Sequence, residues 1–286
     1  MQMSDINGIE VSRFGLGTKR FPTEDSSRVI HLDTKAAGEI FDLCVSRGVN
    51  VFNTSYSNHK GEAESFLGDE ISKSGKDLHV CTSYFEMIDP RYEYVFQKQL
   101  KKLQTETIDF YMIEGVTNMN KEVAIDTGVV DFLFERKEQG EIAQVGFSSE
   151  LKAGLLEEHL KRYPWDFICM KINYYDWFQK GVKDAYEVAA AADVPIIVHG
   201  ALRTGAAQRL KDEAVAIMRE ADSEMSSIEW ALRFVKSLPN ARCITTNVYS
   251  TEQVEEDIRV FEDDEVLDSN GFDVLKAVSE AQKTRK

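Results

Sequence analysis

The sequence lacks the cysteine spacings that mark redox, zinc-ribbon and iron–sulfur sites. Its four cysteines are spread over 286 residues, and none lies within five positions of another. Sites of those kinds need cysteines that are close together in the sequence. We therefore interpret all four as free thiols in a reducing compartment. They are Cys44, Cys81, Cys169 and Cys243.

Long apolar runs and an excess of positive charge are also missing. No stretch approaches the ~18 consecutive apolar residues of a membrane-spanning helix. The N-terminal residues show no apolar run behind a basic patch, unlike a secretory signal peptide. The 49 acidic and 34 basic residues give a formal charge of −15, which disfavours nucleic acids and acidic membranes as partners. We expect a cytoplasmic protein that binds neither nucleic acid nor membrane.

Enough apolar material is present for a large core. The hydrophobic content is 43%, which excludes a disordered chain. Short β-rich runs alternate with segments whose apolar residues recur with the 3.6-residue period of a helix. The β-rich runs are 13–18, 49–55, 78–83, 109–115, 143–149, 166–174, 195–202 and 241–247.

Eight strands, each followed by a helix, predict a (β/α)8 TIM barrel. The alternative is an open doubly wound sheet, which normally carries a glycine-rich phosphate turn after its first strand. Here the first run leads into GTKRFPTEDS, which contains no GxGxxG motif. We therefore predict a single barrel domain over residues 1–286. Residues 262–286 form an acidic segment, interpreted as a solvated loop, followed by a helix.

In such barrels the functional residues lie at the carboxyl ends of the strands. This rule selects candidates before any family is considered, and most of them are polar. They are Asn53 to His59, Ser83, Tyr84, Glu114, Ser148, Ser149, Cys169, Lys171, Asn173, His199 to Gly205, Thr246 and Asn247.

Several segments resemble the aldo-keto reductase family. The segment GVNVFNTSYSNHKGEAESFLGDEI is similar to the family's G-[IV]-N-x-[FI]-D-T-[AS]-x-x-Y, and LQTETIDFYMIEG is similar to LQxDYIDxYLLHG. FICMKINYYDW, PIIVHGALRTG and SSIEWALRFVKSLPNARCITTNVYSTEQVEEDI resemble the ferredoxin-linked branch in order and spacing. The resemblance, from about Val11 to about Phe261, implies the aldo-keto reductase type of barrel. Members of that branch usually continue into a cysteine-rich tail that is not seen here, so we expect no iron–sulfur cluster.

The resemblance implies a catalytic tetrad of Asp, Tyr, Lys and His at positions that hold other residues here. In the family a hydride goes to a carbonyl while the tyrosine donates a proton. An amide is not a usable acid near pH 7, and glutamate replaces the histidine only in family members that retain the tyrosine. We therefore predict that tyrosine-dependent carbonyl reduction is absent or very weak. The four positions are Asn53, Asn58, Ser83 and Glu114.

Two tyrosines stay open as replacement proton donors. Tyr56 would need a register slip to take the place of Asn58, and a shift of two residues moves a group ~6–7 Å along a strand. Tyr84 directly follows Ser83. Either tyrosine, or Glu114 as the proton donor, would make the chain a non-standard oxidoreductase.

The resemblance also implies positions for a nicotinamide cofactor. The family holds the carboxamide with Ser-Asn after the fifth strand and a glutamine on the sixth. The residues here are Ser148, Ser149 and Cys169. Asp257 would repel a 2′-phosphate if it lay near one, so binding of NADP(H) stays open. The remaining implied cofactor positions are His199, Leu202, Arg203, Gly205, Asn247 and Glu256.

Lys171 has the same strand parity as Cys169, so both face the same side of the sixth strand. If Cys169 faces the barrel axis, Lys171 does too. Three roles stay open for the lysine. The first role is an ion pair with Glu114, and the second is an anchor for an anionic ligand. The third is an amine nucleophile that is activated by burial.

Four further residues are candidates for a substrate pocket. His59 belongs to a loop over the mouth, and Trp177 belongs to an aromatic run that the family shares. No spacing forces His59, Glu114 and His199 to converge, so we predict no metal site. The pocket candidates are His59, Tyr84, Asn173 and Trp177.

Three classes of function follow. The first is a small-molecule enzyme with non-redox chemistry of lyase, isomerase or dehydratase type, in which Glu114 is the acid/base and Lys171 its partner. The second is a pseudoenzyme that binds a ligand or a partner protein. The third is a non-standard NAD(P)H-dependent oxidoreductase. We favour the first, because simple decay of a site leaves small or apolar residues, whereas Glu114 and Lys171 introduce charge.

Overall fold

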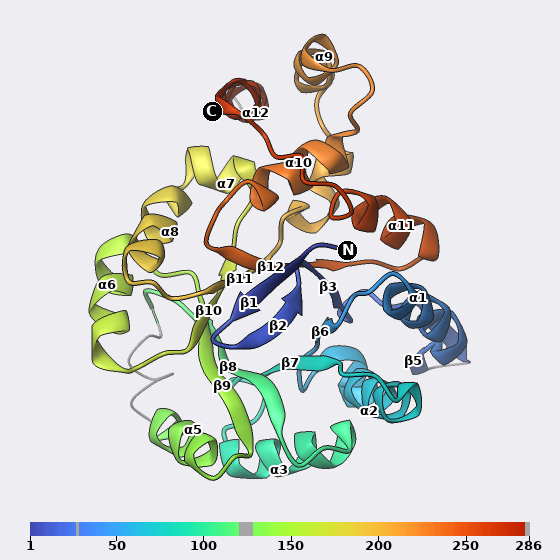
Figure 1. Cartoon of the computed structure of the whole chain (residues 1–286), viewed down its shortest axis with the longest axis vertical. Coiled ribbons are helices and arrows are strands. Elements are labelled where there is room, and N and C mark those ends of the chain that lie inside the picture. The colour runs from blue at the N-terminus through green and yellow to red at the C-terminus, as the bar shows by residue number, and fades with distance from the viewer. Residues whose placement is uncertain (27–28, 120–127, 284–286) are drawn as a thin grey trace.

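Each of the eight predicted β-rich runs overlaps one strand of a closed parallel barrel in the computed structural model (Figure 1). The structure describes residues 1–26, 29–119 and 128–283. Each strand pairs with the next strand of the chain that belongs to the barrel, and β12 closes the ring on β3. The strands are β3 (Phe14–Gly17), β6 (Val51–Asn53), β7 (His79–Tyr84), β8 (Ile108–Val116), β9 (Ile142–Ser149), β10 (Phe167–Lys171), β11 (Ile196–His199) and β12 (Ala241–Asn247). The predicted (β/α)8 barrel is confirmed.

Helices surround the barrel, as Figure 1 shows. The main ones are α1 (Thr34–Ser46), α2 (Glu62–Ser74), α3 (Tyr92–Leu103), α5 (Val129–Glu138), α6 (Ala153–Arg162), α8 (Val182–Ala191), α10 (Ser227–Lys236) and α11 (Thr251–Arg259). Additional elements are η1 (Asn58–Gly61), α7 (Tyr174–Gln179), η2 (Arg203–Gln208), α9 (Asp212–Ala221) and α12 (Ser269–Ala281). In the described part of the chain, no helix has both the length and the apolar character needed to cross a bilayer.

Two β-hairpins lie outside the barrel, and the sequence patterns did not predict them. One consists of β1 (Met3–Ile6) and β2 (Ile9–Ser12). Its Ile6 and Val11 pack on Val51 and Phe110 inside the barrel, so this hairpin closes the amino-terminal end. The other hairpin consists of β4 (Thr23–Ser26) and β5 (Val29–Leu32).

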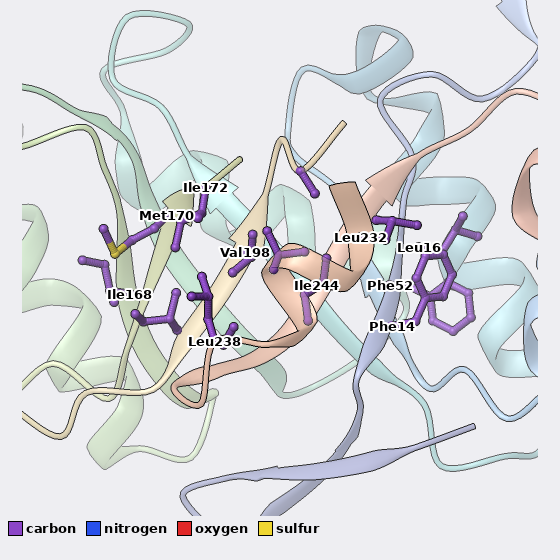
Figure 2. Close-up of a cluster of buried hydrophobic side chains, with 14 of the residues drawn as sticks. Phe14, Leu16, Phe52, Ile168, Met170, Ile172, Val198, Leu232, Leu238 and Ile244 are labelled. Atoms are coloured by element: carbon purple, nitrogen blue, oxygen red, sulfur yellow. The ribbon is translucent and has the colours of Figure 1, made fainter. Parts of the chain in front are cut away.

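The core has an inner and an outer layer because successive strand residues point to opposite faces. The inner layer includes Cys81, Cys169 and Cys243, and all four cysteines are buried free thiols, as predicted. The outer layer packs the strands on the helices. Figure 2 shows part of this layer, including Phe14, Leu16, Phe52, Ile168, Met170, Val198, Leu232 and Ile244.

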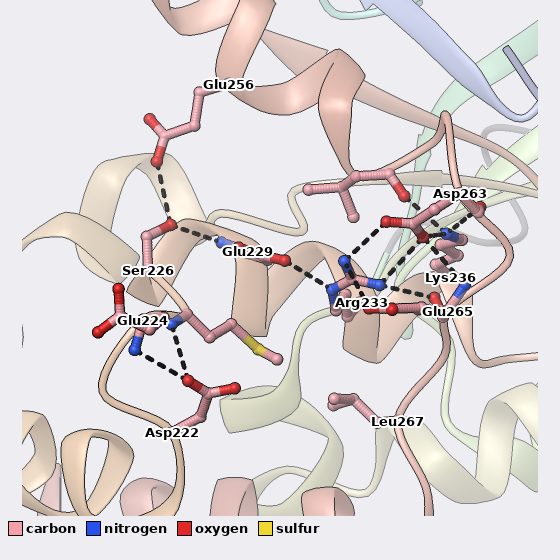
Figure 3. Close-up of polar contacts among 12 residues, drawn as sticks. Asp222, Glu224, Ser226, Glu229, Arg233, Lys236, Glu256, Asp263, Glu265 and Leu267 are labelled. Atoms are coloured by element: carbon pink, nitrogen blue, oxygen red, sulfur yellow. Dashed lines mark hydrogen bonds and ion pairs between the residues drawn. The ribbon is translucent and has the colours of Figure 1, made fainter.

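The acidic segment after α11 is not simply solvated, which corrects the sequence interpretation. Asp263 accepts hydrogen bonds from Arg233 at 2.9 Å and from Lys236 at 2.9 Å (Figure 3). Lys236 is fully buried, and its burial lowers the pKa of its ammonium. Desolvation opposes ionisation of Asp263, but the hydrogen bonds from the two cations hold its pKa below the usual range. The segment is therefore attached to α10 by charged contacts.

Candidate functional site

The inward side chains at the carboxyl end of the barrel form a polar ring. Several of them follow an inner-core residue by two positions, as Lys171 follows Cys169 and His199 follows Ile197. This spacing places them on the same inner face, one layer nearer the mouth. The ring consists of Asn53, Ser83, Glu114, Ser148, Lys171, His199 and Asn247.

Glu114 and Ser83 form the acidic side of this ring. The Ser83 hydroxyl donates a hydrogen bond to Glu114 Oε2 at 2.7 Å. Ser83 is buried, whereas Glu114 is half-buried and meets solvent. The hydrogen bond fixes the direction in which the carboxylate points. The pair therefore presents an oriented acceptor to the mouth.

A buried network behind β7 holds Ser83 in place, and the sequence patterns did not reveal it. Gln99 of α3 donates to the Ser83 carbonyl at 3.1 Å and to Glu64 of α2 at 2.7 Å. The Tyr111 hydroxyl donates to Gln99 Oε1 at 2.6 Å. Glu64 is fully buried and pairs with Lys102 at 3.3 Å. These residues lie on different elements and become neighbours only when α2 and α3 pack on the barrel.

The loop after β6 is bound to the loop after β3. Asn58 Nδ2 donates to Thr18 Oγ1 at 3.1 Å. His59 Nε2 donates to the Thr18 carbonyl at 3.0 Å, with a left-handed backbone at φ 49°. Asn53, at the end of β6, hydrogen-bonds the buried Cys81 thiol, whose pKa is raised to about 12 by burial. Asn58 and His59 therefore hold the mouth's loops together.

The basic side of the ring contains Lys171 and His199, which are in register on β10 and β11. Burial, together with the charges of Lys171 and Lys19, lowers the pKa of His199 to about 4, so its imidazole is neutral at pH 7. His199 Nε2 is buried, and it has no hydrogen-bond partner among the residues that the structure describes. This side of the mouth therefore combines a cation with a neutral imidazole.

The ion pair considered for Lys171 and Glu114 is wrong. Within the described ranges neither side chain forms a salt bridge, and the Glu114 carboxylate contacts Ser83 instead. Lys171 is half-buried, not buried, so the amine-nucleophile role loses the burial that it assumed. Gly200 makes room for the lysine, because a Cβ there would lie 3.0 Å from Lys171 Cγ.

Both tyrosines considered as proton donors point away from the mouth. Tyr84 follows the inward Ser83, so strand alternation turns it outward, where it packs edge-on against Tyr92. Burial raises its pKa to about 12. The Tyr56 ring lies under the Lys102 ammonium, at 4.7 Å from its centroid, on the side of α3. Neither side chain reaches the polar ring.

Two of the pocket candidates make contacts that support the fold. Trp177 is buried and packs on Tyr186 and Phe234 in the helical layer. The predicted sixth β-rich run also extended too far, because β10 ends at Lys171. Asn173 beyond it is buried and caps α7, accepting from the Asp176 N–H at 2.9 Å.

The residues implied for a nicotinamide cofactor are divided between the mouth and the outer layer. Ser148 and Cys169 lie side by side in register on β9 and β10, facing inward. Ser149 points outward, and its hydroxyl oxygen accepts from the Leu151 N–H at 3.1 Å. Asn247 Oδ1 accepts from the Lys19 N–H at 3.1 Å. The cofactor's carboxamide would therefore meet at most part of the implied set.

The loop after β11 folds into the short 3₁₀ helix η2, which starts after Leu202 and contains Gly205. Arg203 has φ 49°, and its guanidinium stacks on the Tyr175 ring at 3.7 Å. This stacking holds the arginine against α7, beside the mouth.

Asp257 is turned toward the barrel. It is buried and accepts a hydrogen bond from Thr246 at 2.6 Å. Burial raises its pKa to about 7. Its neighbour Glu256 accepts from Ser226 at 3.0 Å (Figure 3). The repulsion of a 2′-phosphate that the sequence suggested, on condition that Asp257 lies near one, stays a prediction.

The histidines and carboxylates considered for a metal remain separate. In residues 1–26, 29–119 and 128–283, no three His, Cys, Asp or Glu side chains form a group suited to a metal ion. His59 is bound to the Thr18 carbonyl, while Glu114 is bound to Ser83.

Comparison with known proteins identifies the family. The model of the Aldo/keto reductase family matches residues 13–280. The uncharacterized oxidoreductase YqkF of Bacillus subtilis is 22% identical over 284 residues, covering 88% of this chain and 87% of the relative. An uncharacterized oxidoreductase of Mycobacterium tuberculosis is 26% identical over 153 residues, which are 52% of this chain and 46% of that protein.

Solved structures share the fold. The aldo-keto reductase AKR11C1 from Bacillus halodurans, in its holo form, superposes with a TM-score of 0.79 at 20% identity, covering 97% of this chain and 95% of that one. The glycerol dehydrogenase AKR11B4 from Gluconobacter oxydans gives a TM-score of 0.77 at 17% identity, with 98% and 95% covered. From the family match over residues 13–280, this chain belongs to the aldo/keto reductase family.

Proposed function

We propose that this chain is a small-molecule enzyme whose mouth performs acid–base chemistry without net redox change, such as isomerisation, elimination or carbon–carbon cleavage. The observation that carries the proposal is the half-exposed Glu114 carboxylate, oriented by the Ser83 hydroxyl at 2.7 Å. Lys171 and neutral His199 occupy the other side of the same ring. A carboxylate and a cation that are not paired with each other are both available to a substrate.

The proposal assigns Asn53, Asn58, Ser83 and Glu114 to the family's four catalytic positions, and the chain to the neighbourhood of the ferredoxin-linked branch. Asn58 offers only an amide, already bonded to Thr18, so it supplies no proton for carbonyl reduction. The outward positions of Tyr56 and Tyr84 support the same reading.

We assign a role in this chemistry to each polar group of the ring. Glu114 removes a proton from a carbon next to a carbonyl or returns one to it, and Ser83 keeps the carboxylate oriented. Lys171 stabilises the negative charge that develops on the substrate oxygen. His199 is neutral at pH 7, so it offers an imidazole nitrogen without adding a second positive charge.

A second candidate function is a non-standard oxidoreductase in which Glu114 donates the proton. The observation in its favour is that YqkF and the mycobacterial relative both carry the name oxidoreductase. Ser148 and Cys169 would face the nicotinamide, and the loop with Arg203 would face the phosphates.

NADPH consumption separates the two candidates. We expect a panel of reactive aldehydes, ketones and quinones to give turnover far below the ~1–10 per second of typical enzymes. The positive test is proton exchange. Small carbonyl acids incubated in D2O with the protein should gain deuterium next to the carbonyl, at least ~100-fold more slowly with Glu114→Gln. Typical NADPH turnover, or exchange unaffected by this variant, would contradict the proposal.

A further inference from the structure

The Ser83 carbonyl lies where β7 has lost its neighbouring strand. The pairing of β6 with β7 ends with Asn53 opposite Cys81, and the Thr54 N–H donates to the Cys81 carbonyl at 2.8 Å. Carbonyls two residues apart on a strand point to the same side, so the Ser83 carbonyl faces the side that β6 has left. Among the described residues, no backbone N–H of the loop after β6 reaches it. A buried carbonyl needs a donor, so another group has to supply one.

Gln99 of α3 supplies this donor. Its amide nitrogen donates to the Ser83 carbonyl at 3.1 Å and to Glu64 Oε1 at 2.7 Å. Thr82 Oγ1 lies 3.1 Å from the same nitrogen and shares its hydrogens. Gln99 is fully buried, so water does not compete for these contacts. The end of β7 is therefore attached to α3 by a side chain, at a point where a neighbouring strand would otherwise hold it.

The amide of Gln99 has one favourable orientation. The Glu64 carboxylate pairs with Lys102 at 3.3 Å, so its oxygens accept hydrogen bonds, and the Ser83 carbonyl also only accepts. On the other side, the Tyr111 hydroxyl donates to Gln99 Oε1 at 2.6 Å. Burial raises the pKa of Tyr111 well above its ordinary value, so this hydroxyl keeps its proton. A flipped amide would place its oxygen against two acceptors.

Glu114 depends on Ser83 because the strand pairing around it is irregular. The register between β8 and β9 shifts between Ile113 and Val116, a stretch that contains Glu114. On the other side, the register of β7 with β8 ends with Tyr84 opposite Ile113. The hydrogen bond from the Ser83 hydroxyl at 2.7 Å therefore orients the carboxylate where the backbone ladder no longer does.

From these contacts we infer that Gln99 is a positioning residue for the acid–base chemistry of Glu114. It fixes the end of β7, and the Ser83 hydroxyl passes that position on to the carboxylate. Tyr111 holds the amide in the required orientation. Because Gln99 is fully buried, it acts through Ser83 and does not contact the substrate. The inference rests on the proposed function, since it explains how the same carboxylate is kept in place.

Gln99→Met tests the inference, because methionine keeps the length of the side chain and removes the donor. The kcat of deuterium exchange into pyruvate, used as the probe, should fall by about 10- to 100-fold, since a displacement of about 1 Å can cost 100-fold in rate. KM should change by less than about twofold, because Gln99 does not contact the substrate. Gln97→Met is the matched control on the exposed side of the same helix and should leave both values unchanged.

Tyr111→Phe is the second variant, and it keeps the inference testable if Gln99→Met does not fold. It removes only the hydroxyl that holds Gln99 Oε1. The amide can then rotate, so kcat should fall by about three- to tenfold with KM unchanged. In the Gln99→Met background the same change should have no further effect on kcat. Circular dichroism shows that each variant is folded at the temperature of the assay.

Crystal structures give a readout that does not depend on activity. The contact between Ser83 Oγ and Glu114 Oε2 should be lost in Gln99→Met and kept in Gln97→Met. The inference is overturned if this contact persists in Gln99→Met, or if kcat does not change there. Failure of the proposed function gives a different result, because Glu114→Gln would leave exchange unchanged while the contact still depends on Gln99.

Discussion

Lys171 and Glu114 show that two opposite charges in one barrel mouth need not form a pair. Each remains half-buried, and the carboxylate takes its hydrogen bond from Ser83. Water and the serine then solvate the two groups separately. A buried pair would instead make each residue dependent on the other.

We expect the stability effects of Lys171→Met and Glu114→Gln to be small and additive. Glutamine keeps an oxygen that accepts from Ser83, so each variant should change the free energy of unfolding by less than about 1 kcal/mol. The coupling energy from the double-mutant cycle should stay below about 0.5 kcal/mol. Denaturant unfolding of the four proteins measures it. A coupling of ~3–5 kcal/mol would show a buried ion pair after all.

Asp257 is a residue whose burial links stability to pH. Its pKa in the folded protein is about 7, against 3.8 as its ordinary value, and burial is the cause. The folded state therefore binds the proton more tightly than the unfolded chain. This group's contribution to stability is fully present below pH 4 and is lost as the pH rises to about 7, by about 4 kcal/mol.

Asp257→Asn should remove this loss, because an amide oxygen still accepts from Thr246 and carries no charge. The variant should be more stable than the parent at pH 8 and differ little at pH 4. Unfolding by denaturant at both pH values measures the difference. Glu255→Gln on the same helix is the control and should show no such pH dependence. An equal shift of Asp257→Asn at both pH values would mean that the carboxyl does not titrate in this range.

At the scale of elements, α2 and α3 approach each other closely at one glycine. A Cβ on Gly68 would lie 2.3 Å from the Lys102 carbonyl oxygen and 2.8 Å from the Leu103 carbonyl carbon. These are backbone atoms, so the helices themselves would have to separate. The same helices provide Glu64 and Gln99 to the network behind Ser83, so their spacing also affects the mouth.

Gly68→Ala should therefore destabilise the protein by about 1–3 kcal/mol through overpacking, although alanine is the better helix former. Gly38→Ala is the matched control in α1, where an added Cβ has open space. It should stabilise the protein by about 0.5–1 kcal/mol. Thermal unfolding of both variants is the measurement. If both shift the midpoint upward, the contact between α2 and α3 is looser than described.

Elements and their order were predictable from the sequence, whereas contacts between elements were not. Period-two and 3.6-residue patterns located every barrel strand, and the strand-end rule selected Ser83 and Glu114. The outward position of Tyr84 could have been predicted too, because it follows an inward residue. Gln99 behind Ser83 could not, because nothing in the local pattern of α3 shows which strand residue it will face.

At the scale of the whole molecule, the acidic excess opposes the compact state. The formal charge is −15, with 49 acidic and 34 basic residues. Folding brings these negative charges closer together, and their mutual repulsion destabilises the folded state. The repulsion acts over long distances and is not located in any single contact. Attractive pairs such as Arg233 with Asp263 act locally and are partly buried, so salt screens them less than it screens the general repulsion.

Adding salt should therefore raise the midpoint of thermal unfolding. From 0.01 M to 0.15 M NaCl the Debye length falls from about 30 Å to about 8 Å, and a gain of about 1 kcal/mol corresponds to about 2–4 °C in a domain of this size. Most of this rise in the unfolding midpoint should occur below 0.2 M NaCl, because screening is already strong at that concentration. An effect of salt on the solvent would instead continue to grow at higher concentrations. Three exposed glutamates, Glu138, Glu158 and Glu220, form no salt bridge within the described part of the chain and provide the control. Changing all three to glutamine reduces the formal charge from −15 to −12, so the triple variant should respond less to salt. A midpoint that falls with salt would instead show that local ion pairs outweigh the general repulsion.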